Sequence, residues 1–246
     1  MLAAGLAAIW GAVALGHFPH GWLAVATVVA GHGALLATAL TWATRGSGPA
    51  WVALALLGGA AVATRLTRLG GLAYLAPALW VARLAAHGRL RALGLGPQVP
   101  GRPLLTGIGI GAFLGAHLLV SASQTLGYRV RADPVEVALW VAYDVGANVL
   151  AAEGFFRGAL FNRTQRRGSF AAAVAVSTVA CLVRYLVDPL LPRTAAIVIG
   201  MAFYLSLVSV ANCWLLWWSG SLVPGFATSL LFFAAYRLLE TSGIPR

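Results

Sequence analysis

An acidic and a basic residue stand four positions apart in an otherwise apolar stretch of the chain. Glu153 and Arg157 lie in the segment from Ala152 to Arg163, and on a helix this spacing places both side chains on one face, within reach of each other. A charged pair inside a membrane is costly. It therefore marks either a functional site or a neutralised structural pair that locks two helices together. The spacing alone leaves both interpretations open.

Further polar residues interrupt the neighbouring apolar segments. Arg184 lies inside the next apolar segment and needs a counter-charge, for which there are three candidates: Asp144, Glu153 and Asp188. Our hypothesis is that Glu153, Arg157 and Arg184 form one buried ionic cluster that holds two core helices together. The full predicted buried polar cluster comprises Asp144, Asn148, Glu153, Arg157 and Arg184.

The composition identifies the class of protein that must position these residues. The chain has 246 residues, of which 60% are hydrophobic and 9% are charged, and its mean hydropathy is +0.85. A soluble domain has roughly 25% charged residues, so one soluble core cannot hide this much apolar surface. The sequence therefore predicts a polytopic membrane protein whose first partner is the lipid bilayer.

Apolar stretches long enough to span a bilayer recur along the whole chain, separated by Gly, Pro and Arg. They predict an all-α, polytopic transmembrane helix bundle of about eight to nine spans, at residues 2–16, 22–43, 51–64, 72–86, 104–121, 135–162, 170–187, 194–218 and 222–239. The first stretch lacks a basic n-region, so we expect a retained helix and not a cleaved signal peptide.

The longest polar stretch divides the chain into parts. We predict an N-terminal four-helix part at 1–88, a connecting loop at 89–103 and a transmembrane core at 104–240.

All basic residues are arginine, and the net charge is +11. No clustered basic domain stands outside the spans, so we expect no nucleic-acid partner. The side with Arg45, the 83–102 loop and the 163–167 loop holds eight arginines against seven on the other, and we place it in the cytoplasm.

No two histidines have a metal-type i, i+3 or i, i+4 spacing on a transmembrane face, since His17 and His20 flank a turn. The cysteines do not have the spacing of a metal site either. His32 and His117 stand alone inside spans, where a histidine is more often hydrogen-bonded across helices than catalytic. Cys181 and Cys213 lie in apolar runs and are expected to be small buried residues. We therefore expect no metal and no cofactor.

The segment around Glu153 resembles a known family. The sequence Glu-Gly-Phe-Phe-Arg-Gly-Ala-Leu-Phe-Asn-Arg at 153–163 is similar to the EExxxR signature of the CPBP intramembrane proteases, the CAAX prenyl protease, bacteriocin-processing and Abi-like group. The residues at 93–95 and 219–224 fall where that family has similar ones, so the resemblance extends from about residue 90 to 238. It implies a CPBP-like core in which a glutamate and a histidine activate water, while a second histidine and an asparagine stabilise the oxyanion.

The sequence departs from the family pattern at each further catalytic position. Ala152 stands in place of the first glutamate, which leaves the remnants Glu153 and Arg157. The FxxxH motif falls on 181–184 and puts Arg184 in place of histidine, while the HxxxN motif falls on 228–232 and gives Thr228 and Phe232. Alanine and phenylalanine have no polar side-chain group, and arginine cannot act as a general base.

Three functions remain open. The first is a catalytically inactive CPBP-like protein, a pseudoenzyme, that keeps a cavity for a peptide, a lipidated peptide or a partner membrane protein. The second is an active intramembrane endopeptidase with a rewired centre, in which Glu153 works with His117 or with residues of a partner. The third is a small transporter or channel lined by Asp144, Asn148 and Arg184. In each case we expect a multi-pass protein of the bacterial inner (plasma) membrane.

Overall fold

Long apolar helices make up most of the chain in the computed structural model, which describes residues 11–12, 15–17, 22–96, 98–130, 133–188 and 194–240. The first group of elements consists of α2 (Leu23–Thr27), η2 (Val28–His32), α3 (Gly33–Thr44), α4 (Gly48–Leu66), η3 (Arg68–Tyr74), α5 (Leu75–Ala86) and η4 (Arg91–Leu93). Since α2, η2 and α3 are continuous, as are η3 and α5, these elements form three membrane-length helices.

The remaining elements begin with α6 (Gly101–Leu126). They continue with β1 (Arg129–Val130), α7 (Pro134–Tyr143), η5 (Asp144–Asn148), α8 (Val149–Ala152), η6 (Glu153–Phe161), α9 (Asn162–Gln165), α10 (Phe170–Leu186), α11 (Ala195–Ser219), α12 (Val223–Leu238) and β2 (Leu239–Glu240). The strands β1 and β2 form a short antiparallel pair, with Arg129 opposite Glu240. The elements from α7 to α9 form one long helix at 134–165.

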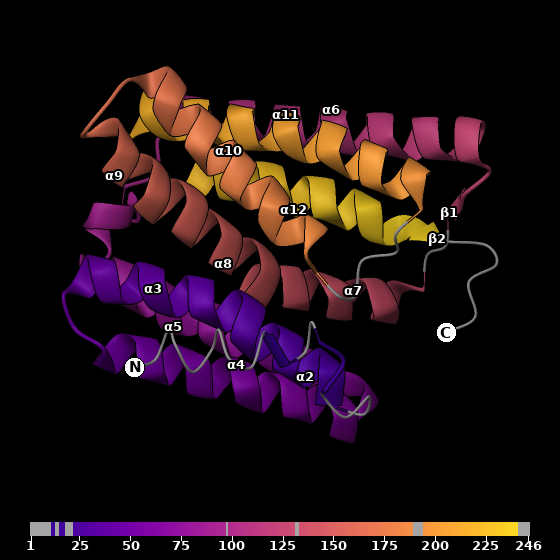
Figure 1. The fold of residues 1–246 in the computed structure, drawn as a ribbon, viewed down its shortest axis with the longest axis horizontal. Helices are drawn as coiled ribbons and strands as arrows, with labels where there is room; N and C mark the ends of the chain where they lie inside the picture. The colour runs from indigo at the N-terminus through magenta and orange to yellow at the C-terminus, as the bar shows by residue number, and fades with distance from the viewer. Residues whose placement is uncertain are drawn as a thin grey trace.

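The long helix at 134–165 lies in the middle of the molecule. Figure 1 shows it between the N-terminal group of α2 to α5 and the group formed by α6, α10, α11 and α12. Its η6 segment contacts α3 on one side and α10 and α11 on the other. The segment that carries Glu153 and Arg157 is therefore covered by helices from both parts of the chain.

The predicted all-α membrane bundle is confirmed. Six helices in the described part of the chain are long and apolar enough to cross a membrane, and α10 and α12 are shorter apolar helices. Their bounds follow the predicted spans to within a few residues, except for the stretch at 2–16, which lies largely outside the described residues. Large apolar side chains such as Phe113, Ile199 and Trp217 point outward, as expected for lipid-facing surfaces.

Polar residues and glycines set the helix ends. Asp133 caps α7 by accepting a hydrogen bond from the amide of Val135 at 2.9 Å, and Ser169 caps α10 through the amide of Ala172 at 3.2 Å. Gly127 and Gly220 take left-handed backbone conformations after α6 and α11, which glycine adopts without steric cost. These signals start and stop the spans that the hydropathy pattern predicts.

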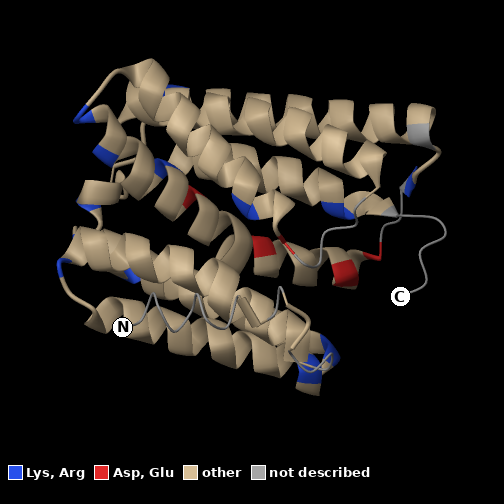
Figure 2. Ribbon diagram, viewed as in Figure 1, with Lys and Arg blue, Asp and Glu red and all other residues tan. Residues whose placement is uncertain are grey.

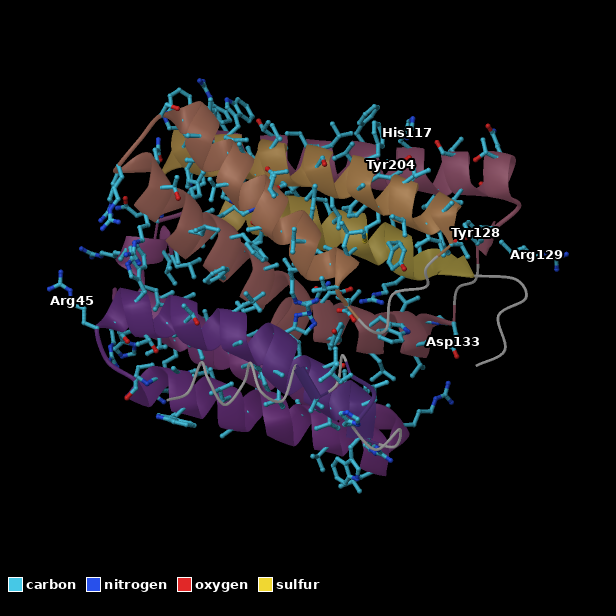
Figure 3. The ribbon with its side chains drawn as sticks, viewed as in Figure 1. Arg45, His117, Tyr128, Arg129, Asp133 and Tyr204 are labelled. Atoms are coloured by element: carbon cyan, nitrogen blue, oxygen red, sulfur yellow. The ribbon has the colours of Figure 1, made fainter. Side chains whose placement is uncertain are left out.

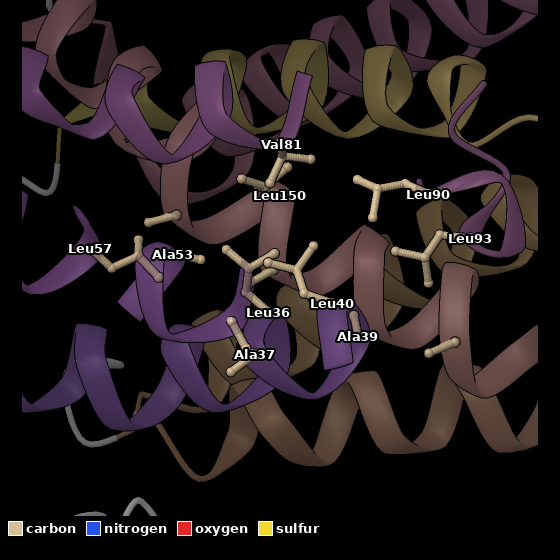
Figure 4. Packing of buried hydrophobic residues seen from close by; sticks show 14 of the residues in the cluster. Leu36, Ala37, Ala39, Leu40, Ala53, Leu57, Val81, Leu90, Leu93 and Leu150 are labelled. Atoms are coloured by element: carbon tan, nitrogen blue, oxygen red, sulfur yellow. The ribbon is translucent and has the colours of Figure 1, made fainter. Parts of the chain in front are cut away.

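One hydrophobic core cluster includes residues from both predicted parts of the chain. Leu150 of α8 packs among Leu36 of α3, Leu57 of α4 and Val81 of α5 (Figure 4). The same cluster continues to Leu222, just before α12. The division of the chain at 89–103 stays a prediction. In the structure, residues from before and after this loop pack in the same core cluster.

Glycines on α6 allow a close approach to α12. Gly107, Gly111 and Gly115 recur every fourth residue, the small-xxx-small pattern of close helix pairs. A Cβ atom on Gly111 would lie 2.6 Å from the carbonyl oxygen of Thr228, whereas a Cβ atom on Gly109 would meet nothing within 4 Å. Gly111 therefore lies in the contact between α6 and α12, whereas Gly109, two residues earlier on the same helix, does not.

We expect Gly111→Ala to destabilise the protein by about 1–3 kcal/mol, because the added methyl group forces the two helix backbones apart. Gly109→Ala is the matched control and should leave stability unchanged or slightly higher, since alanine favours helix. Thermal unfolding of both variants in the same detergent measures the difference. Equal unfolding temperatures for the two would contradict the observed packing of α6 on α12.

Candidate functional site

Glu153 and Arg157 form a buried ion pair on η6. Each residue has only 2% of its surface exposed, and Nε of Arg157 lies 3.6 Å from Oε2 of Glu153. The segment is a π-helix, a wider helix type that recurs at functional sites. The structure thus brings together the two residues whose spacing suggested a site.

Two side chains from other helices hold the second carboxylate oxygen of Glu153. The amide Nδ2 of Asn212 on α11 donates to Oε1 at 2.9 Å, and the hydroxyl of Ser229 on α12 donates to the same atom at 2.9 Å. Asn212 also donates to Ser229 at 2.8 Å. One carboxylate therefore joins η6, α11 and α12 through a cation and two neutral donors.

A thiol completes this buried centre from α10. Nη1 of Arg157 donates to the sulfur of Cys181 at 3.4 Å. One turn earlier, Ser177 donates to the carbonyl oxygen of Phe156 at 2.8 Å. Both cysteines are buried and unlinked, as expected from the sequence. We call Glu153, Arg157, Cys181, Asn212 and Ser229 the ionic centre.

The sequence did not indicate Asn212, Ser229 or Cys181 as site residues. On α12, the pair of positions that faces the ionic centre and has the four-residue spacing of the HxxxN motif is Gly225 and Ser229. A Cβ atom on Gly225 would lie 3.2 Å from Cβ and Cγ of Asn212. Asn212 therefore fills the space that a larger side chain at position 225 would need.

The positions assigned to the family motifs from the sequence lie elsewhere. Thr228 is buried against α6 and donates to the carbonyl oxygen of Gly107 at 2.8 Å, and Phe232 packs in an apolar cluster with Tyr204. Neither makes a polar contact with Glu153. Ser229, and not Thr228, therefore faces Glu153 on α12; both residues are buried, and the sequence does not tell which of them does so. Ala152 is buried in a small apolar cluster beside the ionic centre, with Phe156 and Cys181.

Arg184 is not part of the ionic centre. Its Nη1 lies 2.8 Å from Oδ2 of Asp188, which stands just beyond the end of α10. Within the described ranges, no ion pair joins it to Glu153 or Asp144. The hypothesis of one cluster containing Glu153, Arg157 and Arg184 is corrected accordingly: Asp188, four residues later in the chain, supplies the counter-charge.

Asp144 and Asn148 belong to a second buried polar network. Arg237 of α12 donates from Nε to Oδ2 of Asp144 at 3.1 Å and from Nη2 to Oδ1 at 3.0 Å. Asn148 donates to Asp144 at 3.0 Å and accepts from the hydroxyl of Tyr185 at 2.8 Å. Arg237 also lies over the ring of Trp140, 4.5 Å from its centroid. A bidentate arginine and an amide thus satisfy the carboxylate.

The two histidines of the described spans lie away from the ionic centre. Nε2 of His32 pairs with the hydroxyl of Tyr143 at 2.7 Å, and Nδ1 of His117 pairs with the hydroxyl of Tyr204 at 2.7 Å. Figure 3 shows His117 and Tyr204 together, where α6 meets α11. The pairing of Glu153 with His117 that a rewired active centre would use is absent here. No group of three or more possible metal ligands occurs among the described residues.

The ionic centre lies inside a stretch that matches a family model. Residues 134–235 match the model described as type II CAAX prenyl endopeptidase Rce1-like. Over these residues the chain is similar to the Rce1-like family. The match confirms the resemblance to the CPBP group, and it covers the helices from α7 to most of α12. No match was found among curated proteins or among solved structures.

The hydroxyl of Ser229 should contribute measurably to the stability of the Rce1-like region. We expect Ser229→Ala to cost about 1–2 kcal/mol, because a buried carboxylate oxygen loses one of its two donors. Ser206→Ala is the control, since Ser206 donates only to the carbonyl oxygen of Ala202 on its own helix. Unfolding of both variants in one detergent compares them. A loss no larger in Ser229→Ala than in the control would argue against the bond.

The second buried polar network should depend on Arg237. We expect Arg237→Leu to destabilise the protein by about 3–5 kcal/mol, because Asp144 is left charged and buried without a cation. Arg68→Leu is the matched control. Arg68 pairs with Asp133 at 3.1 Å, but 72% of its side chain is exposed, so its loss should cost no more than about 1 kcal/mol. The double variant Asp144→Leu/Arg237→Leu should recover part of the lost stability, and no recovery would exclude the ionic explanation.

Proposed function

We propose that this integral membrane protein is a catalytically inactive relative of the CAAX-type endopeptidases, with a binding role in place of proteolysis. The observation that carries the proposal is the state of Glu153. A general base must be free to take a proton from water, but Arg157 neutralises this carboxylate, and Asn212 and Ser229 occupy its Oε1. No histidine of the described residues reaches it.

The residues around Glu153 also differ from those of a hydrolytic centre. An oxyanion site needs donors aimed at the place where charge develops on a substrate. Here the donors Asn212 and Ser229 are aimed at the protein's own carboxylate. Both side chains already donate to a group of the protein itself, which supports a structural role for the remaining family residues.

The proposed ligand is a peptide, a lipidated peptide or a partner membrane protein, bound within the bilayer. The match to the Rce1-like family supports this class, because the family is named for CAAX prenyl endopeptidases. We place the protein in a bacterial inner (plasma) membrane with the end that carries Arg45 in the cytoplasm. That end holds the two densest arginine clusters, which supports the orientation.

The alternative is an active endopeptidase with a rewired centre. One observation favours it: Oε2 of Glu153 accepts no hydrogen bond from the described residues. A third candidate, a transporter or channel lined by Asp144, Asn148 and Arg184, gains less support. Asp144 is closed off by Arg237, and Arg184 pairs with Asp188.

A cleavage assay separates the two readings. The purified protein in lipid nanodiscs is given prenylated and unprenylated peptides ending in a CAAX sequence, and products are followed by mass spectrometry. We expect no cleavage above that of the Glu153→Gln variant, together with photo-crosslinking to the prenylated peptide that exceeds crosslinking to the unprenylated one. Cleavage by the wild type that Glu153→Gln abolishes would establish the enzyme. Equal crosslinking to both peptides would overturn lipidated-peptide binding.

A further inference from the structure

The two ends of the bundle differ in charge. The chain has six acidic residues. Glu153 lies in the interior, and the other five lie at or toward the end where β1 pairs with β2: Asp133, Glu136, Asp144, Asp188 and Glu240. The opposite end carries eight arginines and no acidic side chain: Arg45, Arg83, Arg89, Arg91, Arg102, Arg163, Arg166 and Arg167. Figure 2 shows blue without red at this tip, and Figure 3 places Arg45 there, opposite Asp133.

Three of these arginines line an open pocket. The pocket has a volume of about 430 Å³ and is lined by Trp42, Arg163, Arg166 and Arg167. Trp42 lies in the last turn of α3. Arg163 lies within α9, and Arg166 and Arg167 follow its last residue. The guanidinium of Arg166 lies 6.0 Å from the ring centroid of Trp42. The ring and the cations therefore face one space.

Within the described part of the chain, the arginines of the pocket have no anionic partner. Arg163, Arg166 and Arg167 are all exposed, and none of them forms an ion pair with another described residue. Three positive charges so close together repel one another, and an anion between them relieves that repulsion. The guanidinium fork matches the geometry of phosphate oxygens. The pocket thus has the chemistry of a phosphate site.

The position of the pocket identifies where the phosphate comes from. The membrane-length helices at 23–44 and 134–165 both end at the pocket, so the arginines lie at the level where lipid headgroups begin. Tryptophan prefers the same interface, and basic pockets between spans on the cytoplasmic side recognise anionic headgroups. We propose that Trp42, Arg163, Arg166 and Arg167 bind the headgroup phosphate of one anionic glycerophospholipid.

The site is independent of whether the ionic centre is catalytic. It connects to that centre through the chain itself, because Arg163 lies two residues after the end of the π-helical segment that holds Glu153 and Arg157. A bound lipid would fix the end of this helix between α3 and α10. The consequence is a headgroup-dependent stability that the apolar spans alone would not give.

Native mass spectrometry of the full chain in detergent tests the proposal. Phosphatidylglycerol and phosphatidylcholine with the same acyl chains are titrated separately, and inorganic phosphate is added in a third arm. We expect the wild type to retain phosphatidylglycerol preferentially. The variant Arg163→Gln/Arg166→Gln/Arg167→Gln should bind it at least about tenfold more weakly, since each basic residue near the headgroup contributes to anionic-lipid affinity. Inorganic phosphate at millimolar concentration should not displace the lipid.

The matched control is Arg89→Gln/Arg91→Gln/Arg102→Gln, which removes the same charge from the same end of the bundle but leaves the pocket intact. Its affinity for phosphatidylglycerol should stay within about threefold of the wild type. Equal losses in both triple variants would overturn the site in favour of general surface charge. Equal retention of both lipids, or displacement by inorganic phosphate, would overturn the lipid assignment. If thermal melting shows that the pocket variant does not fold, Arg166→Gln and Arg89→Gln replace the two triple variants, with the same outcomes deciding.

Discussion

A carboxylate that is buried in the middle of a membrane bundle must be neutralised, and the arrangement of the central helices follows from this requirement. Taking the charge of Glu153 out of water costs several kcal/mol, which only a close cation and good hydrogen bonds can offset. Arg157 supplies the cation from the same helix, and Asn212 and Ser229 supply donors from two others. The helices η6, α11 and α12 are thereby held in one register.

The same requirement explains the second network. Asp144 stands on the same long helix as Glu153, and Arg237 reaches it from near the end of α12. The long helix at 134–165 therefore contacts α12 through two polar interactions, one with Ser229 and one with Arg237. Separating either pair inside a bilayer would leave buried polar groups without partners, which is energetically costly. A central helix fixed in this way is suited to a rigid scaffold.

The sequence was sufficient to predict the helices but not all of their contacts. Hydropathy and breaker residues locate the spans, because length and apolar content are local properties. The i, i+4 spacing also predicts the pairing of Glu153 with Arg157. The same spacing favours Asp188 as the partner of Arg184. The partners Asn212 and Arg237 were missed because they stand 59 and 93 positions away from the acids they contact. No local pattern encodes which face of an apolar helix turns inward.

The register of α12 shows this limit most clearly. Thr228 and Ser229 are both small, polar and buried, so composition cannot distinguish them. Only the packing of α6 on α12, through Gly107 and Gly111, turns Thr228 toward α6 and leaves Ser229 facing Glu153. The glycine pattern was visible in the sequence, but the helix it packs against was not.

A double-mutant cycle on Glu153 and Arg157 measures whether the two charges neutralise each other in the bundle. Unfolding free energies are measured in one detergent for the wild type, Glu153→Leu, Arg157→Leu and the double variant. If the two side chains neutralise each other in the bundle interior, each single change leaves a buried charge. The coupling energy should then be at least about 2 kcal/mol. Additivity within about 0.5 kcal/mol would contradict the account, because it would mean that Glu153 does not depend on Arg157.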